Sequence, residues 1–174
     1  MVILPRTDSS ALQAPGVQRG SLAAETLWSA IGSFAGIGIV AFLALQYRLP
    51  LLVASFGATA VLVYAAVDSP LAQPRNVIGG HLISAVAGVL NYQLLGTTWW
   101  SIALGVSMAI AAMVLTRTLH PPGGATAIVA VWSGQGYTYI FAPVGVGAVI
   151  LLLVALLVNH FAPGRHDPAG RQSN

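Results

Sequence analysis

Long apolar segments, separated by short polar breaks, fill residues 22–162 of this chain. A helix of about 20 apolar residues can cross a hydrocarbon core about 30 Å thick. We predict helices in the apolar segments, which cover residues 23–47, 51–67, 77–95, 101–116, 125–132 and 140–161. The polar ends, residues 1–21 and 163–174, are predicted to be a flexible N-terminal tail and a polar C-terminal tail.

The length of each segment decides how it can meet a bilayer. Residues 23–47 and 140–161 are long enough to cross, residues 51–67 are close to the minimum, and residues 125–132 are too short to cross alone. We predict an all-α polytopic bundle of six transmembrane segments, some of them short, broken or re-entrant. In the alternative arrangement residues 125–132 never cross, which leaves five crossings.

The composition supports this membrane assignment. The chain of 174 residues is 56% apolar and only 6% charged, and its mean hydropathy is +0.81. Soluble domains carry about 25% charged residues, so this chain cannot cover a surface that faces water. The positive charges are scattered arginines with no basic patch, which argues against a nucleic-acid partner.

The two halves of the body, residues 22–95 and 97–162, resemble each other. Gly57-Ala58-Thr59-Ala60 recurs 67 residues later as Gly124-Ala125-Thr126-Ala127, and the same order of helices, breaks and arginines surrounds each copy. With three crossings in each half, the halves become inverted repeats. In such repeats, short or broken helices at matching positions indicate a transport site near the membrane midplane.

The arginines favour one orientation of this bundle. Six crossings with a cytoplasmic N-terminus leave only Arg48 outside. The other six arginines then lie inside: Arg6, Arg19, Arg75, Arg117, Arg165 and Arg171. The positive-inside rule favours this arrangement.

The most unusual stretch is Arg117-Thr118-Leu119-His120-Pro121-Pro122-Gly123-Gly124. Two prolines in succession supply no backbone N–H and stop an arriving helix, although proline suits the first turn of a new one. We therefore predict a helix that ends, a tight bend and a second helix that starts near Pro121. Gly123 and Gly124 let a backbone or a small ligand approach closely, and the free N–H groups of the new helix suit an anion.

Polar side chains near these predicted helix ends are candidates for contact with the anion. Arg117 and His120 would attract or gate it, whereas in the simpler alternative Arg117 reaches the headgroups and His120 caps the break. Asp68 and Arg75 either belong to the site or pair across their loop. His81 either faces the same cavity as His120 or donates to a backbone carbonyl.

The threonines at the matching repeat positions, Thr59 and Thr126, are hydroxyl donors for a ligand, or they bond to their own helix. Together, the residues predicted to bind substrate are Gly57, Thr59, Asp68, Arg75, Asn76, His81, Arg117, His120, Pro121, Pro122, Gly123, Gly124 and Thr126.

Enzymatic and cofactor chemistry is not expected. The chain has no cysteine, which excludes disulfides and thiolate catalysis. His81 and His120 lack a third metal ligand at motif spacing, so we expect no metal site. No nucleotide-binding loop and no partnered nucleophile is present, so we expect neither a cofactor nor an enzyme.

The motifs resemble one known family. The run His120-Pro121-Pro122-Gly123-Gly124-Ala125-Thr126-Ala127 is similar to the signature of the HPP family of integral membrane proteins. A second similar block joins Gly57-Ala58-Thr59-Ala60 to the loop of residues 68–76 and to Gly79-Gly80-His81. The resemblance covers about residues 22–162 and implies nitrite transport.

We therefore expect a transporter of a small monovalent anion, with nitrite as the leading substrate and the site at broken-helix N-termini near the midplane. The alternatives are a passive channel for a small solute and a non-transporting membrane subunit. The expected location is the inner (plasma) membrane of a bacterium, since no long transit segment precedes the body. The expected partners are the anion, the lipid bilayer and further copies of the chain.

Overall fold

The computed structural model describes residues 21–48, 51, 53–163 and 165. The predicted tails lie almost wholly outside the described residues. The described part is a bundle of helices whose bounds are α1 (Leu22–Gln46), α2 (Ser55–Ala65), η2 (Pro70–Ala72), α3 (Pro74–Leu95), α4 (Trp99–Leu115), α5 (Pro122–Trp132), η3 (Ile140–Gly145) and α6 (Val146–Phe161).

The helix pattern confirms the predicted all-α polytopic bundle. Three helical segments in the described part are long and apolar enough to cross a membrane: Leu22–Gln46, Pro74–Leu95 and Ile140–Phe161. The shorter apolar helices are α2, α4 and α5, with 11, 17 and 11 residues.

Local chemistry fixes several helix ends. The hydroxyl of Ser21 accepts a hydrogen bond from the N–H of Ala24 at the start of α1. Thr98 and Ser101 form a reciprocal capping box at the start of α4. The double proline ends one helix and starts the next as predicted, since α4 ends at Leu115 and α5 begins at Pro122.

The second predicted segment is wrong in its length. Residues 51–67 were expected to form one helix near the minimum for a crossing, but α2 has only 11 residues and begins at Ser55. Leu51 and Val53 are apolar because they are buried in the core ahead of the helix, at 2% and 7% exposure. The apolar character of Leu51 and Val53 therefore reflects their burial and does not indicate where the helix starts.

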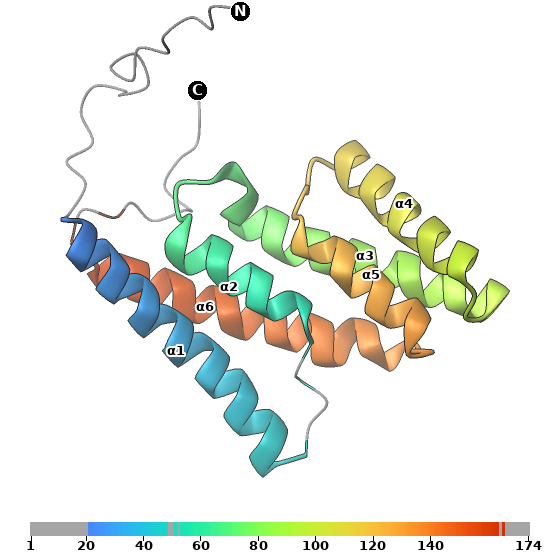
Figure 1. Cartoon of the computed structure of the whole chain (residues 1–174), viewed down its shortest axis with the longest axis horizontal. Coiled ribbons are helices and arrows are strands. Elements are labelled where there is room, and N and C mark those ends of the chain that lie inside the picture. The colour runs from blue at the N-terminus through green and yellow to red at the C-terminus, as the bar shows by residue number, and fades with distance from the viewer. Residues whose placement is uncertain (1–20, 49–50, 52, 164, 166–174) are drawn as a thin grey trace, which may run out of the picture.

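The two halves contain the same three helices in opposite directions. Figure 1 shows α1, α2 and α3 running antiparallel to α4, α5 and α6, respectively. The matched short helices α2 and α5 have equal lengths and begin 67 residues apart, at Ser55 and Pro122. The first helix of each half is followed by an arginine with a left-handed backbone, Arg48 with φ of 53° and Arg117 with φ of 55°.

The short helices begin in the middle of the molecule. The N-terminal turns of α2 and α5 lie close together in Figure 1, and Ser55 on α2 is hydrogen-bonded to Thr126 on α5. From this centre the two helices run in opposite directions. α3 packs against α4 and α5, and α1 packs against α2 and α6.

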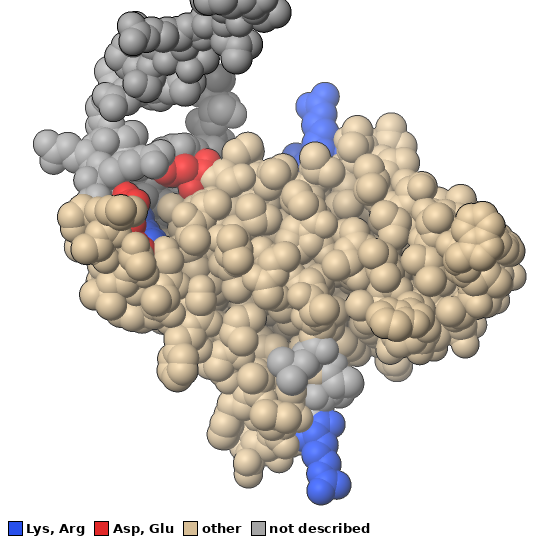
Figure 2. Space-filling model, in the orientation of Figure 1, with Lys and Arg blue, Asp and Glu red and all other residues tan. Residues whose placement is uncertain are grey.

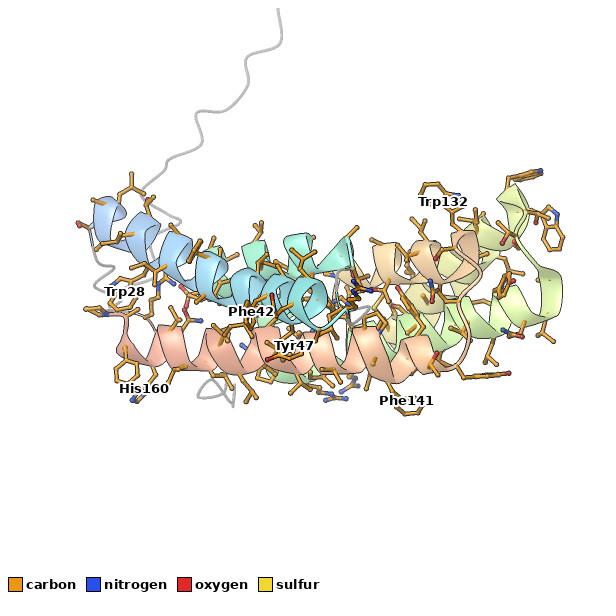
Figure 3. All side chains as sticks on the ribbon, turned by 90° about the horizontal axis from the view of Figure 1, so that it is seen from below. Trp28, Phe42, Tyr47, Trp132, Phe141 and His160 are labelled. Carbon is orange, nitrogen blue, oxygen red and sulfur yellow. The ribbon has the colours of Figure 1, made fainter. Side chains whose placement is uncertain are left out.

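The surface has the character expected of a protein in lipid. Figure 2 shows a broad surface without charge, with arginine side chains emerging at the upper and lower edges and acidic side chains at the upper left. In Figure 3, Trp132 and Phe141 point outward toward one end of the bundle, while Trp28 and His160 lie at the other. Each long helix exposes large apolar side chains, for example Phe34 on α1, Leu94 on α3 and Leu153 on α6. Such a surface needs lipid or another apolar cover.

Candidate functional site

Four polar side chains meet where α2 and α5 begin. They are Thr59 of α2, His81 of α3, His120 of the segment before α5, and Thr126 of α5, and all four have 0% exposure. The sequence analysis selected each of them, but it could not show that they touch. We call these four side chains together with Ser55 the central cluster.

The ring of His81 joins the two halves of the protein. Its Nε2 lies 2.8 Å from Oγ1 of Thr59, and its Nδ1 lies 2.9 Å from Oγ1 of Thr126. These threonines occupy the matching position of each repeat. A single imidazole therefore bridges two repeat-related hydroxyls.

The ring of His120 lies beside it. Its Nε2 is 3.1 Å from Oγ1 of Thr59, and its Nδ1 is 2.9 Å from the carbonyl oxygen of Leu71. Because a carbonyl only accepts, Nδ1 of His120 carries the proton that forms this bond. The centroids of the two imidazole rings are 4.9 Å apart.

Glycines allow the helices to come this close. A Cβ on Gly123 would lie 2.6 Å from Oγ of Ser84 and 2.9 Å from the carbonyl oxygen of Gly80, and a Cβ on Gly80 would overlap that of His120. Gly124 and Gly57, by contrast, have no neighbour within 4 Å of such a Cβ. The first turn of α5 is thus pressed against α3 at Gly123 while its next residue faces open space.

One expectation about this turn is wrong. The first N–H groups of α5 were expected to be free, but Gly123 donates to the carbonyl of His120 at 2.9 Å and Gly124 to that of Pro121 at 3.0 Å. α2 repeats this pattern, since Phe56 and Gly57 donate to the carbonyls of Val53 and Ala54. The partial positive charge at both helix N-termini remains, since it is a property of the whole helix.

The predicted arginines lie outside the central cluster. Arg117 is exposed. Arg75 is exposed too and donates from Nη2 to the carbonyl of Thr116 at 2.8 Å, while Asn76 donates to that of Leu119 at 2.9 Å. Arg75 and Asn76 thus fasten the segment between α4 and α5. Of the two prolines, Pro121 is exposed and Pro122 is buried.

Asp68 lines a different site. A cavity of about 360 Å³ lies at the C-terminal end of α2, at the opposite end from the central cluster, and is lined by Glu25, Ala65, Ala66, Val67, Asp68, Ser69 and Arg165. Arg165 donates to the carbonyls of Tyr64 and Glu25. Burial lowers the pKa of Arg165, and the charges of Glu25 and Asp68 act in the opposite direction.

Three further groups bond to the central cluster and were not predicted from the sequence. Ser55 is hydrogen-bonded to Thr126 at 2.9 Å, the carbonyl of Leu71 is bonded to His120, and the hydroxyl of Tyr139 donates to the carbonyl of Thr126 at 3.2 Å. Ser55 had a usable signal, because it precedes Thr59 by four residues and shares its helix face. The other two contacts depend on the tertiary fold.

The described residues contain no group of three or more His, Cys, Asp or Glu side chains that could hold a metal ion. The central cluster offers hydroxyl and imidazole groups without a carboxylate. Such a set can donate hydrogen bonds to an anion and can exchange protons.

Comparison with known proteins assigns the family. A family model described as "HPP, transmembrane region" matches residues 18–168. This chain belongs to the HPP transmembrane family. The resemblance drawn from the motifs is confirmed, and the match covers both repeat halves.

Two similar proteins come from Dictyostelium discoideum, and each is described as a transmembrane protein. One is 44% identical over 155 residues, which are 81% of this chain and 49% of that protein. The other is 43% identical over 153 residues, which are 81% of this chain and 54% of that protein. The HPP chain thus spans about half the length of these relatives. No solved structure matches.

Proposed function

We propose that this HPP protein transports a small monovalent anion, with nitrite as the leading substrate. The observation that carries the proposal is the meeting of two short antiparallel helices, α2 and α5, whose N-termini both lie at the central cluster. Helix N-termini attract negative charge, and broken helices of inverted repeats surround the sites of several transporter folds.

The central cluster supplies suitable groups for such an ion. The hydroxyls of Thr59 and Thr126 and the N–H groups of the two imidazoles can replace the water that an anion loses on entry. The arginines of this region, Arg75 and Arg117, are exposed. A site with only partial positive charges suits one negative charge better than two, because burying an uncompensated charge is costly.

The cluster is closed in this structure, since its side chains are fully buried. Transport therefore requires α2 or α5 to move against α3, so that the cluster opens to one side at a time. This motion is proposed to begin at the first turn of α5, where Gly123 lies tightly against Gly80 and Gly124 has open surroundings.

The proposal also covers the class of the protein, its membrane and its assembly. We propose a transporter in place of an enzyme; in the described residues the central cluster pairs hydroxyls with imidazoles but has no orienting carboxylate. The proposed location is a bacterial inner membrane with the N-terminus in the cytoplasm, and the small residues on exposed helix faces leave room for a homo-oligomer.

The test is uptake of nitrite into liposomes that contain the purified chain, with nitrate, formate and chloride as competitors. The internal pH is clamped, because nitrous acid crosses lipid unaided. We expect saturable uptake above that of empty liposomes. Uptake equal to that of empty liposomes would exclude nitrite and favour another solute or the non-transporting subunit, while uptake that never saturates would favour the passive channel.

A further inference from the structure

The central cluster forms one continuous chain of hydrogen bonds. The two polar atoms of each of its five hydrogen bonds lie 2.8–3.1 Å apart, and the two imidazole rings join these bonds into one series. We call this series the relay chain; its order is Ser55 Oγ, Thr126 Oγ1, His81 Nδ1, His81 Nε2, Thr59 Oγ1, His120 Nε2, His120 Nδ1 and the carbonyl oxygen of Leu71.

In the proton arrangement that we assign to the uncharged cluster, every bond of the relay chain runs in the same direction. The hydroxyls of Thr59 and Thr126 also have the backbone carbonyls of Ser55 and Pro122 as acceptors, at 3.1 Å and 3.5 Å. His120 donates from Nδ1 to Leu71, so its Nε2 accepts, and Thr59 is the donor to that nitrogen. Thr59 then accepts from Nε2–H of His81. The bare Nδ1 of His81 accepts from Thr126. Ser55 must then donate to Thr126, which reverses the direction from Thr126 to Ser55 found in the structure.

One added proton reverses all of these bonds. When Ser55 gains a proton, it passes its own to Thr126, Thr126 passes one to Nδ1 of His81, His81 releases the Nε2 proton to Thr59, and Thr59 protonates Nε2 of His120. The chain has then gained one proton and one positive charge, which resides on His120. Thr126 now donates to Ser55, the direction found in the structure, which an uncharged His81 with its proton on Nδ1 gives as well.

The relay chain connects segments from opposite sides of the bundle. It starts on α2 at Ser55, shortly after the end of α1, and finishes at His120, shortly after the end of α4. Because the halves are antiparallel, α1 ends at the lower edge and α4 at the upper edge of Figure 1. Because the side chains of the relay chain are all buried, a proton that moves along it travels within the centre of the protein, from the α1 side toward the α4 side.

A positive charge on His120 has few compensating groups in the closed cluster. His120 faces His81 of α3 and Thr59 of α2, neither of which is anionic. Tyr139 is bonded to the carbonyl of Thr126, Arg75 to that of Thr116, and the carboxylates of Glu25 and Asp68 line the cavity at the far end of α2. The adjacent N-terminus of α5 is itself partly positive and opposes the charge.

A bound anion at the N-terminus of α5 compensates the charge of the imidazolium and offsets the repulsion between that charge and the helix N-terminus. It pairs with the imidazolium, and the imidazolium in turn favours the anion, so each ligand raises the affinity for the other. We propose that the protein carries one proton together with each monovalent anion, and that the relay chain delivers this proton to His120. This inference rests on the proposed anion transport. The pair crosses without net charge.

The first experiment measures charge and protons in the same liposomes. Wild-type protein is reconstituted with a pH dye inside, the same alkaline pH is set on both sides, and a nitrite gradient is applied with and without a potassium potential set by valinomycin. Empty liposomes measure the leak of nitrous acid, which is subtracted. We expect the rate of nitrite uptake to be independent of the membrane potential. We also expect one proton to enter the liposome with each nitrite ion, so that the interior becomes more acidic.

Each other result contradicts part of the account. Saturable uptake that the potential drives and that leaves the internal pH unchanged would overturn the relay but keep the anion transport. Proton entry without nitrite would overturn the coupling and the anion transport together. If neither ion moves, both proposals fail.

Substitutions can distinguish proton transfer by His81 from its role in packing the helices. In His81→Gln the side-chain amide can still donate to one threonine and accept from the other, but it cannot pass a proton. We expect nitrite uptake and acidification to fall together by at least about tenfold. His160→Gln, on the exposed end of α6, is the matched control and should behave as wild type.

Wild-type rates for His81→Gln would overturn the relay. If that variant does not fold, His120→Gln repeats the test at the end of the chain. Wild-type uptake in heavy water gives a further measure that needs no variant, since a relay must slow there and a rate unchanged from ordinary water would contradict it.

Discussion

At the scale of single residues, the decisive feature is that polar groups in the middle of an apolar bundle satisfy each other. A buried imidazole or hydroxyl without a partner costs about 1–3 kcal/mol. The sequence identified His81, His120, Thr59 and Thr126, because polar residues and prolines are rare in such a body. The hydrogen-bond partners of these residues could not be predicted from the sequence, because they are 22 to 61 residues apart and meet only in the folded bundle.

This pairing predicts the effect of removing one hydroxyl. Thr59→Val keeps the shape of the side chain but removes the partner of both His81 and His120. We expect destabilisation of about 1–3 kcal/mol, visible as a lower unfolding temperature in detergent. Ser107→Ala removes a hydroxyl that bonds only within α4 on the exposed surface and should change little. Equal unfolding temperatures for the two variants would contradict the hydrogen-bonded cluster.

At the scale of helices, the short pair α2 and α5 organises the molecule. The double proline predicted the start of α5, because proline acts locally, and the short apolar stretch of residues 125–132 predicted its brevity. The start of α2 was misplaced, because buried apolar residues precede it without a strong breaker at the junction. Sequence periodicity also gave no sign that the first turn of α5 lies against α3, which the glycines make possible.

Neighbouring glycines on α5 provide a matched test of that contact. In Gly123→Ala the new methyl meets Oγ of Ser84 at 2.6 Å and the carbonyl of Gly80 at 2.9 Å, whereas in Gly124→Ala it meets nothing within 4 Å. We expect Gly123→Ala to lose about 1–3 kcal/mol of stability through overpacking. Gly124→Ala should fold like wild type in thermal unfolding and size-exclusion profiles. The reverse ranking would mean that α5 does not pack on α3 as described.

At the scale of the whole molecule, the antiparallel halves follow from a repeat that the sequence revealed only weakly. The matched lengths of α2 and α5 and the left-handed Arg48 and Arg117 make the correspondence much clearer in three dimensions. Helix direction depends on tertiary packing, which the apolar composition of every segment leaves undetermined. The weak repeat and the arginine pattern were the sequence signals that carried topological information.

The inverted halves predict that Arg48 and Arg117 lie on opposite sides of the membrane. The chain has no cysteine, so Arg48→Cys and Arg117→Cys each introduce a single thiol. We expect an impermeant maleimide, applied to intact cells, to label Arg48→Cys and to label Arg117→Cys only after the membrane is opened. Labelling of both from one side would contradict the inverted arrangement.

The most direct test of the central claim is nitrite uptake into pH-clamped liposomes by His120→Ala, measured beside wild type and the surface control His160→Ala. The account predicts saturable uptake by wild type and by His160→Ala, and uptake near that of empty liposomes by a folded His120→Ala. Wild-type uptake by His120→Ala would contradict the account and move the anion pathway away from the central cluster.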